Sequence, residues 1–458
     1  VRVGADDLVR VLGPWRSGEA SLSAALARAV REALLDGRVR AGSELPAERR
    51  LAAALGVSRG TVTAALDRLR EAGWVRTRHG SASTVQVPAA LAERVAPLSA
   101  TGDAGSLVDL RRAVPAAPHE LYLKATGRAI ARAGPLLAEH GEPGPGIDEL
   151  RAGLAARHSG EGLATRPEQI LVTSGARAAL TLLAAHFRPR VAVVEIPTYA
   201  DALRILRVPG TRLVGCRVTA DGWDMDQLRD AFAAARGHLA YLVPDFHNPT
   251  GALMPPQVRR DVAELAAEHG VTLVVDETMR DLDLRDQPSP EPRIRGALLV
   301  GSTSKSVWGG LRIGWIRAPA SLIRRLQDHP LAGPLSAPPM QQLVAAELLA
   351  DLEAVLGRRR AELRRQRDHL GDLLAGDDRW SFTLPAGGLT LWLRLTTALA
   401  ETVVERAAAN GVALAAGPRF AADATLVHHL RVPYTPPPHV LEQIAAVLDD
   451  ACRVALRR

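Results

Sequence analysis

The 458-residue chain has few cysteines and no long apolar run, and both absences narrow what it can be. Cys216 and Cys452 are too few for a disulfide framework or a cysteine-built zinc site, and no HExxH motif occurs among the 13 histidines, so we expect no metal. No stretch of roughly eighteen apolar residues is free of charge, which argues against a membrane-spanning helix. The first residues carry charges where a signal peptide requires an apolar stretch, so we expect a cytoplasmic protein without a membrane partner.

Lysine is almost missing from the chain. Of the 57 Lys and Arg residues, only Lys124 and Lys305 are lysines. A composition biased toward Ala, Arg and Gly explains the scarcity, and drift is the simpler explanation for Lys124. Arginine keeps its proton in proteins, whereas lysine can lose it and act as a nucleophile. A lysine that persists against this bias is a candidate for chemistry, and the surroundings of Lys305 support that role.

Positive charge gathers in residues 1–87, which hold 14 arginines and 9 acidic residues and so carry +5 of the total charge of +7. Such an excess suggests contact with a polyanion. Apolar residues recur at helical spacing in 22–35, and two further helices are expected at 46–55 and 58–73, followed by two β-rich runs around a turn at Gly80. This pattern predicts a winged helix-turn-helix; a helical protein-interaction domain is the alternative.

The third of these helices carries short polar and arginine side chains in its first turn, which suit phosphates and base edges in a major groove. The stretch ELPAERRLAAALGVSRGTVTAALDRLREAGWVRTRHGS, Glu44 to Ser81, resembles the GntR family of bacterial regulators. The resemblance implies binding of double-stranded DNA. The residues expected at that contact are Arg49, Ser58, Arg59, Thr61, Thr63, Arg78 and Gly80. We assign this domain to 1–87 and a linker rich in Ala, Pro, Gly and Ser to 88–108.

Beyond the linker, short β-rich runs alternate with amphipathic helices over 109–458. Apolar runs such as VAVVEI (191–196) and TLVVDE (272–277) predict a mostly parallel sheet covered by helices on both faces. One long Arg-rich helix is expected at 339–375, before further β-rich runs. We therefore expect an α/β domain whose large lobe spans about 160–330 and whose smaller α+β lobe spans about 340–458.

Polar residues gather where several of these strands end, which is where open parallel sheets bind ligands. The turn of Ser174, Gly175 and Ala176 precedes an apolar helix and can expose backbone N–H groups to a phosphate; a plain tight turn is the alternative. Asp276 ends an uncharged strand, where a carboxylate needs a partner such as a protonated heterocyclic nitrogen; an N-cap is the alternative. A Schiff-base lysine, here Lys305, and a carboxylate at a pyridinium nitrogen are the pair that pyridoxal 5′-phosphate requires.

The stretch around this lysine adds further candidates. Ser302 and Ser304 precede it in GSTSKS and can bond a phosphate, and Arg312 follows as a second positive charge expected to lower the pKa of the amine. Asn248, in NPTG, can donate to a phenolate oxygen, and Tyr199 can stack on the ring. Asn248 and Tyr199 could equally belong to an ordinary turn or core.

From about residue 109 onward the chain resembles the fold-type I, aspartate-aminotransferase-like domains that bind pyridoxal 5′-phosphate. The motifs that carry this resemblance are TSGA (173–176), VEIPTY, NPTG (248–251), Asp276 and SxSK followed by Arg312. The resemblance implies a cofactor site formed by Ser174, Gly175, Ala176, Tyr199, Asn248, Asp276, Ser302, Ser304, Lys305 and Arg312. It also places Arg431 where such enzymes grip a substrate carboxylate, with a surface arginine beside a strand as the alternative.

A GntR-type head on an aminotransferase-like body is the organisation of the MocR subfamily of transcriptional regulators, which nearly the whole chain resembles. The subfamily implies a homodimer whose paired heads bind operator DNA and whose body senses the cofactor or an amino compound that reacts with it. Three positions depart from the pattern: Met279 replaces a common tyrosine, Arg177 replaces a common glutamine, and His140–Gly141 replaces an aromatic residue. A missing phenol alters proton handling, so a regulator is favoured over a working aminotransferase, and a cofactor-free domain that only dimerises the heads is the third alternative.

Overall fold

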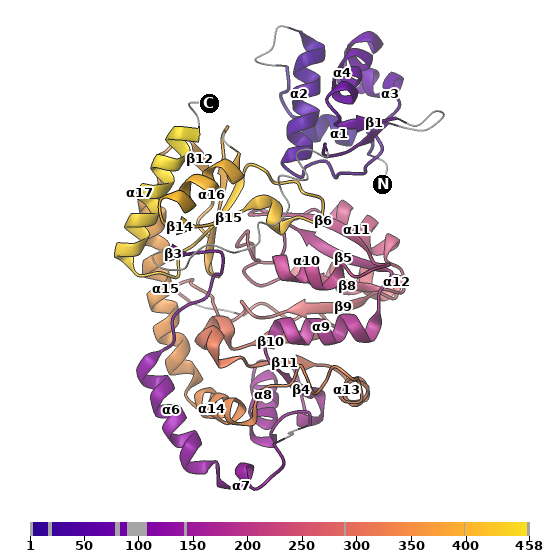
Figure 1. Cartoon of the computed structure of the whole chain (residues 1–458). Coiled ribbons are helices and arrows are strands. Elements are labelled where there is room, and N and C mark those ends of the chain that lie inside the picture. Colours follow the sequence, from indigo (N-terminus) through magenta and orange to yellow (C-terminus); the bar gives the residue numbers. More distant parts are fainter. Residues whose placement is uncertain are drawn as a thin grey trace.

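The computed structural model describes residues 3–16, 21–77, 83–88, 108–141, 144–287, 290–397 and 399–455. They form a helical head, a large lobe built on an eight-stranded sheet and a smaller lobe built on a four-stranded sheet (Figure 1). The expected fold class, a winged helix-turn-helix followed by an α/β domain with a smaller α+β lobe, is confirmed. The predicted linker at 88–108 lies outside the described residues except for its two ends.

The head consists of four helices and a two-stranded wing. They are α1 (Ala5–Leu12), α2 (Leu22–Leu35), α3 (Glu48–Leu55), α4 (Arg59–Glu71), β1 (Val75–Arg76) and β2 (Thr84–Val85). The hydroxyl of Ser58 caps α4 by accepting a hydrogen bond from the backbone N–H of Thr61 at 3.1 Å. Val62 and Leu66 on α4 pack against Leu26 on α2, which explains the apolar spacing in both segments. The sequence pattern does not predict α1.

The sheet of the large lobe has a parallel centre. In order across the sheet, its strands are β4 (Ile170–Thr173), β11 (Gly314–Arg317), β10 (Leu298–Ser302), β9 (Thr272–Asp276), β8 (Leu239–Leu242), β5 (Val191–Ile196), β6 (Arg212–Thr219) and β7 (Gly222–Trp223). Strands β10, β9, β8, β5 and β6 run parallel, while β11 is antiparallel to both of its neighbours and β7 to β6. The carboxyl ends of β9 and β10 therefore lie side by side.

Helices cover both faces of this sheet, as its apolar strands require. One face is packed by α9 (Ala176–Phe187), α10 (Ala200–Leu206) and α13 (Ala320–Gln327), and the other by α11 (Met225–Ala234) and α12 (Pro256–His269). Beyond β4, at the end of the molecule opposite the head, lie α6 (His119–Arg132), α7 (Gly134–Leu137), α8 (Asp148–Gly160), η1 (Pro167–Gln169) and α14 (Pro339–Ala350) (Figure 1).

The small lobe has an antiparallel sheet of β12 (Trp380–Ser381), β13 (Thr390–Leu395), β16 (His429–Pro433) and β15 (Ala415–Ala416). The helices around it are α15 (Leu352–Leu374), α16 (Ala400–Ala409) and α17 (Pro438–Ala455), with η4 (Gly417–Phe420) before β16. A parallel pair of β3 (Val108–Asp109) and β14 (Val412–Ala413) joins the start of the body to this lobe. No helix among the described residues combines the length and the apolar character needed to cross a bilayer.

The prediction of one helix at 339–375 is wrong. The helix breaks at Asp351, where φ is −102° and the carboxylate accepts a hydrogen bond from Arg128 on α6 at 2.8 Å. The break lets the chain change partners, because α14 packs against α6 whereas α15 packs against α17. Periodicity cannot show such a change of packing partner.

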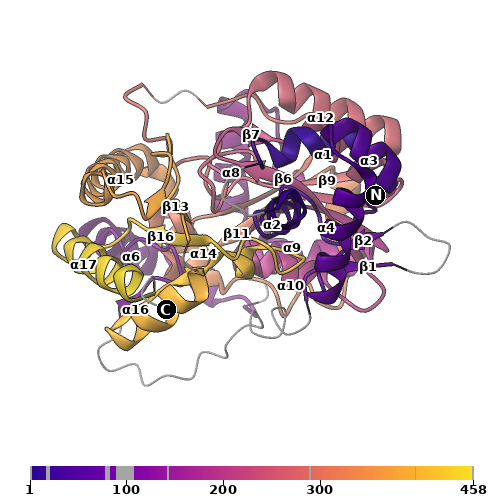
Figure 2. The ribbon, with the colours of Figure 1, turned by 90° about the horizontal axis from the view of Figure 1, so that it is seen from above.

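The head packs against both lobes of the body (Figures 1 and 2). Asp36, which follows α2, forms an ion pair with Arg394 on β13 of the small lobe, with 2.9 Å between Oδ2 and Nη2. Arg40 donates to Gln227 on α11 of the large lobe, from Nε to the side-chain oxygen at 2.9 Å and from Nη2 to the backbone oxygen at 3.0 Å.

Candidate cofactor and effector site

Lys305 lies just past the end of β10, in the short helix η2 (Ser304–Trp308), and its Nζ donates to the backbone oxygen of Ala113 at 2.7 Å. Burial, together with the nearby charges of Arg431 and Arg112, lowers the pKa of this amine to about 8 against the opposing charge of Asp276. The sequence predicts a lowered pKa but attributes it to Arg312; the physical cause is burial together with Arg431. Near neutral pH a substantial fraction of the amine is therefore available as a nucleophile.

Asp276 ends β9, the strand next to β10, and the register of the two parallel strands brings it to the same edge as Lys305. Its carboxylate is almost wholly buried and accepts hydrogen bonds from the hydroxyl of Tyr241 at 2.6 Å and from the backbone N–H of Thr278 at 2.8 Å. Among the described residues no Lys or Arg forms an ion pair with it, and burial raises its pKa. A protonated ring nitrogen is the counter-charge that suits such a carboxylate.

Tyr241 is a further candidate residue of this site, and the sequence does not predict it. It lies on β8, within the apolar run LAYLVP, and both its ring and its hydroxyl are fully buried. Burial and the charge of Asp276 raise the pKa of its hydroxyl, so it stays a proton donor to that carboxylate. The one available signal was a phenol inside an otherwise apolar strand, because a buried hydroxyl needs a partner.

Tyr199 lies at the start of α10, near enough to Asp276 and Arg431 for electrostatic interactions between its hydroxyl and both groups. Its hydroxyl donates to Oδ2 of Asp201 at 3.0 Å, and burial raises its pKa. Nη1 of Arg177 lies 3.8 Å from the same carboxylate oxygen, so Arg177 helps to hold Asp201 beside Tyr199. The ring of Tyr199 is thereby fixed in orientation by its hydroxyl.

Arg431 lies on β16 and is buried, which excludes the alternative of a surface arginine. Its guanidinium donates to the backbone oxygen of Arg111 at 2.6 Å and to Oδ1 of Asn248 at 3.5 Å, and it lies 4.8 Å from the ring centroid of Phe420. Burial, with Arg419 as a second cause, lowers its pKa to about 10. Its Nε is buried without a hydrogen-bond partner among the described residues, so a donor remains for a carboxylate.

The predicted phosphate turn lies at the N-terminus of α9. Gly175 has φ of +114°, and a Cβ on Gly314 would come within 2.4 Å of its carbonyl carbon, so both positions need glycine for this close approach. The N–H of Ser174 is already bonded to the backbone oxygen of Leu335 at 2.8 Å. The first N–H groups of α9, at Ala176 and beyond, have no acceptor within their own helix and can receive an anion.

The other predicted phosphate ligands differ in whether their donors are already engaged within the protein. Ser302 donates its hydroxyl to the backbone oxygen of Ile313 at 2.8 Å and lies 2.9 Å from the hydroxyl of Ser304. Arg312 is exposed, with φ of +57°, and its guanidinium makes no hydrogen bond or ion pair within the described part of the chain. Because Ser302 uses its one proton on Ile313, the hydroxyl of Ser304 donates to Ser302. Arg312 thus keeps free donors, whereas Ser302 and Ser304 would each have to exchange a protein acceptor for a phosphate.

Met279, where related domains often have a tyrosine, is buried in the core that the small lobe shares with Phe246 and Leu282. A thioether offers no proton to a ring oxygen. Asn248 is buried beside Arg431, and its side-chain amide carries the N–H donor that such an oxygen requires. Taken together, Lys305 and Asp276 fit a pyridoxal 5′-phosphate site, and the unsatisfied Nε of Arg431 supplies a donor for a carboxylate ligand.

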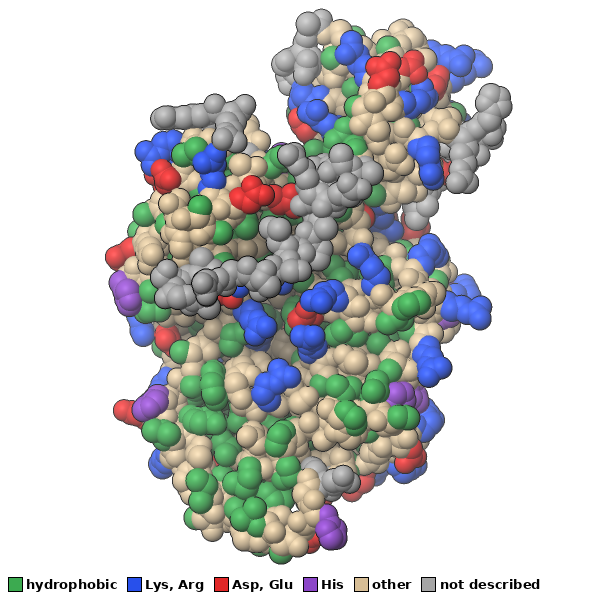
Figure 3. Space-filling view, viewed as in Figure 1, with side chains coloured by type: hydrophobic (Ala, Val, Ile, Leu, Met, Phe, Trp, Pro, Cys, Tyr) green, Lys and Arg blue, Asp and Glu red, His purple; other side chains and the backbone are tan. Residues whose placement is uncertain are grey.

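The residues expected to contact DNA lie mostly on the exposed side of the head, where basic side chains are visible in Figure 3. Arg49, Ser58 and Arg59 are exposed. The hydroxyl of Thr63 donates to Oε2 of Glu48 at 2.9 Å, so it is engaged within the head. Two further predicted residues, Arg78 and Gly80, lie outside the described residues.

Comparison with known proteins agrees with this two-part structure. Residues 105–448 match the family described as aminotransferase class I and II, and residues 22–85 match the gntR family of bacterial regulatory proteins. An uncharacterized HTH-type transcriptional regulator of Bacillus subtilis, YisV, is 28% identical over 414 residues, covering 83% of this chain and 85% of that protein. A 2-aminoadipate transaminase of Thermus thermophilus is 29% identical over 332 residues, covering 69% of this chain and 82% of the transaminase.

A solved structure also has the same fold as the body. LysN, an alpha-aminoadipate aminotransferase from Thermus thermophilus complexed with N-(5′-phosphopyridoxyl)-L-leucine, superposes with a TM-score of 0.72 at 26% identity. The superposition covers 80% of this chain and 97% of LysN. The aminotransferase fold is thus preserved over almost the whole of a pyridoxyl-binding relative.

Proposed function

Because the chain belongs to the aminotransferase class I and II family and carries a gntR-family DNA-binding domain, we propose that it is a transcriptional regulator of the MocR type. The head binds operator DNA, and the body responds to pyridoxal 5′-phosphate or to an amino compound that reacts with it. The cofactor implied by this fold is pyridoxal 5′-phosphate. A DNA-binding role supports the cytoplasmic location that we propose for the protein.

One observation carries the proposal: the strand that bears Arg431 is paired with the strand that holds the head. In the antiparallel register of β13 and β16, Arg431 lies opposite Trp392, and His429 lies opposite Arg394. Arg394 is the ion-pair partner of Asp36 in the head. A ligand gripped at Arg431 therefore acts on the same two strands that support head docking.

This connection supports a regulator in which ligand binding in the body changes the position of the head. A ligand shifts a conformational equilibrium only if it binds the two states differently. A carboxylate bound at Arg431 would favour one position of the small lobe over the other, and the head is attached to that lobe through Arg394. The distance between the two DNA-reading heads of a dimer would change with it, which alters operator affinity.

Each residue of the proposed cofactor site would contact a different part of the cofactor. When bound, pyridoxal 5′-phosphate supplies an electrophilic carbon for amines. Lys305 would anchor it, Asp276 would hold a proton on the ring nitrogen, and Tyr199 would lie against the ring. Asn248 would meet the ring oxygen. The phosphate would be held by the turn at 174–176 with Ser302, Ser304 and Arg312.

We also propose a homodimer, supported by an apolar surface at the end of the body opposite the head (Figure 3). Leu123 and Ile130 on α6 are 56% and 63% exposed, and Leu137 on α7 is 73% exposed. Large apolar side chains in such a group are uncommon on a free surface and are typical of an interface. A second copy of the chain is the expected partner.

Titration of selected DNA tests the proposal. A high-affinity site is first selected from a random-sequence DNA library with the full-length protein, and its affinity is then measured with and without pyridoxal 5′-phosphate. Wild type should change its affinity when the cofactor is added, whereas Lys305→Ala should not. If both proteins respond alike, the sensing role is wrong.

A working aminotransferase is the second candidate, favoured by the intact pair of Lys305 and Asp276 and by the 29% identity to a transaminase. Steady turnover of an amino acid with a keto acid would support it. Sequence-independent DNA binding would support it as well, because the head would then serve only as a tether. Met279 argues for the regulator, since it contributes no proton donor at the ring.

A further inference from the structure

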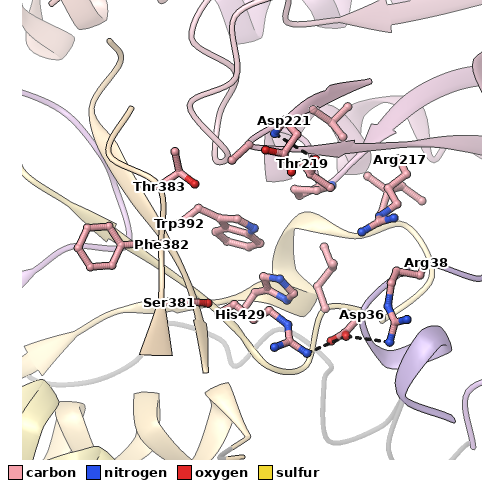
Figure 4. Close-up of a pocket in the computed structure, with 17 residues that line it drawn as sticks. Asp36, Arg38, Arg217, Thr219, Asp221, Ser381, Phe382, Thr383, Trp392 and His429 are labelled. Atoms are coloured by element: carbon pink, nitrogen blue, oxygen red, sulfur yellow. Dashed lines mark hydrogen bonds and ion pairs between the residues drawn. The ribbon is translucent and has the colours of Figure 1, made fainter. Parts of the chain in front are cut away.

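A cavity lies where the head meets the two lobes, away from the cofactor site (Figure 4). Its volume is about 490 Å³, within the range of small-molecule sites. The head contributes Asp36 and Arg38, the large lobe contributes Arg217, and the small lobe contributes Trp392 and His429. A molecule bound there would touch all three parts of the chain.

The wall of this cavity holds three arginines, Arg38, Arg217 and Arg394, but only two acidic residues, Asp36 and Asp221. Asp36 is shared by two arginines, since Arg394 lies 2.9 Å and Arg38 lies 3.4 Å from its Oδ2. The half-buried guanidinium of Arg217 has no hydrogen bond or ion pair within the described residues. In Figure 4 it lies on the same side of the cavity as Arg38. A partly desolvated arginine without a partner is costly, and an anion relieves that cost.

Two further polar atoms in the wall lack partners. Oδ1 of Asp36 and Nδ1 of His429 are both buried without a hydrogen bond among the described residues. The ring of His429 is stacked on Trp392, with ring centroids 5.2 Å apart and an interplanar angle of 18°, so its position is fixed. Burial lowers the pKa of His429 to about 4, so the ring is neutral at physiological pH and adds no charge of its own.

From this arrangement we infer a second ligand site, which takes a small organic anion that also carries a hydroxyl or amino group. The anionic group, a carboxylate or a phosphate, binds Arg217, and the hydroxyl or amino group donates to Oδ1 of Asp36. The occupant bridges head and body and therefore stabilises the docked position of the head. This site is independent of the cofactor and of Lys305.

Matched probes separate the two sources of negative charge. Glycerate carries a carboxylate and glycerol 3-phosphate a phosphate on the same hydroxylated skeleton, and glycerol carries neither. Calorimetric titration of the full-length protein loaded with pyridoxal 5′-phosphate, at about 50 mM ionic strength to limit screening, should show binding of one of the two anions and none of glycerol. The anion that binds identifies the class.

Arg217→Gln is the diagnostic variant, and Arg212→Gln is its matched control, because Arg212 lies on the same strand but is exposed and outside the cavity. Arg217→Gln should lower the affinity for the anion at least about tenfold, and Arg212→Gln should leave that affinity unchanged. Near-visible absorbance of the bound cofactor should be the same in all three proteins, which shows that the body is folded. Binding of neither anion, or equal binding by Arg217→Gln and wild type, overturns the site.

Hydrogen exchange provides the second readout. The backbone N–H of Leu426 donates across the interface to the backbone oxygen of Leu35 at 2.6 Å, so its exchange reports on head docking. Saturating anion should slow this exchange in wild type and not in Arg217→Gln. Unchanged exchange in wild type despite binding would overturn the bridging role.

Discussion

The hydroxyl of Tyr241 donates a hydrogen bond of 2.6 Å to Oδ2 of Asp276, and both groups are buried beneath the carboxyl edge of the central sheet. This bond stabilises the ionised carboxylate against the burial that raises its pKa. We therefore expect Tyr241 to act as a positioning residue: it would hold the charged form and the orientation of the carboxylate that we propose for the cofactor ring nitrogen.

Tyr241→Phe should weaken cofactor binding by roughly tenfold to a hundredfold, because a hydrogen bond to a charged group contributes roughly 1.5–3 kcal/mol. The pH at which the absorbance of the bound cofactor changes should also shift, since Asp276 becomes easier to protonate. Tyr122→Phe is the control, because Tyr122 packs edge-on against Trp308 outside this network. A loss of cofactor affinity with an unchanged pH profile of absorbance would mean that Tyr241 contributes packing but does not affect the protonation of Asp276.

The lowered pKa of Lys305, about 8, predicts a pH dependence of cofactor attachment. Only the neutral amine attacks the aldehyde, so the attachment rate should rise about tenfold per pH unit below pH 8 and level off above it. Stopped-flow absorbance of the cofactor-free protein mixed with pyridoxal 5′-phosphate measures this. A rate that still rises steeply between pH 9 and 10.5 would contradict the assignment.

The same shift has a consequence for stability. The folded state binds fewer protons at Lys305 than the unfolded state between pH about 8 and 10.5, so the cofactor-free protein should become more stable as pH rises through that window. Below pH 8 the cost of burying the charge is fully present. Lys305→Met should therefore stabilise the cofactor-free protein at pH 7, by about 3 kcal/mol, in urea unfolding.

Arg431 should influence Lys305 at a distance, because its charge is the second cause of the lowered amine pKa. Arg431→Gln should move the midpoint of the attachment profile to higher pH and abolish the effect of carboxylate effectors on DNA affinity. Arg419→Gln, at an exposed arginine nearby, should have a smaller effect on both the midpoint and the response of DNA affinity to carboxylates. An unchanged midpoint in Arg431→Gln would show that burial alone sets the amine pKa.

The sequence predicts the sheet, and it predicts that Asp276 and Lys305 lie at the same edge of it, for physical reasons. The apolar runs of β5 and β9 are local signals, and the positions of Asp276 and Lys305 follow from parallel strands whose carboxyl ends meet at one edge. Both residues also stand out chemically, one as a charge in an apolar strand and the other as a rare lysine.

What the sequence does not predict depends on tertiary contacts. The partners of Lys305 and Arg431 are the backbone oxygens of Ala113 and Arg111, and a carbonyl group has no side-chain signature. The break at Asp351 arises from packing against α6, and the docking of the head rests on pairs such as Asp36 and Arg394, which are far apart in the chain. No local pattern encodes such pairs.

Arg59 offers a test of the DNA surface. It is 73% exposed and weakly paired with Glu48, 3.6 Å away, so it is free to reach a phosphate. Arg59→Ala should lower affinity for all DNA sequences and reduce the slope of log affinity against log salt by about 0.9. Arg365→Ala, at an exposed position on α15 of the body, is the control and should leave the slope unchanged.

The ion pair between Asp36 and Arg394 should set how firmly the head is docked. Burial alone would raise the pKa of Asp36, but the charges of Arg394 and Arg38 lower it, so the carboxylate stays charged in the docked state. A group with a lowered folded-state pKa stabilises the docked state above its free pKa and loses that contribution as pH falls. Docking should therefore hold at pH 5 and weaken below about pH 4, as measured by exchange of the Leu426 amide.

A double-mutant cycle isolates the pair from its surroundings. Asp36→Asn and Arg394→Gln should each speed exchange at Leu426, and the double variant should be less affected than the sum of the two, with a coupling energy of about 1–3 kcal/mol for such a partly buried pair. Because Arg394 lies on the strand paired with that of Arg431, both single variants should also reduce the change in DNA affinity caused by the cofactor. If docking weakens in both variants while that change is fully retained, the signal does not pass through this ion pair.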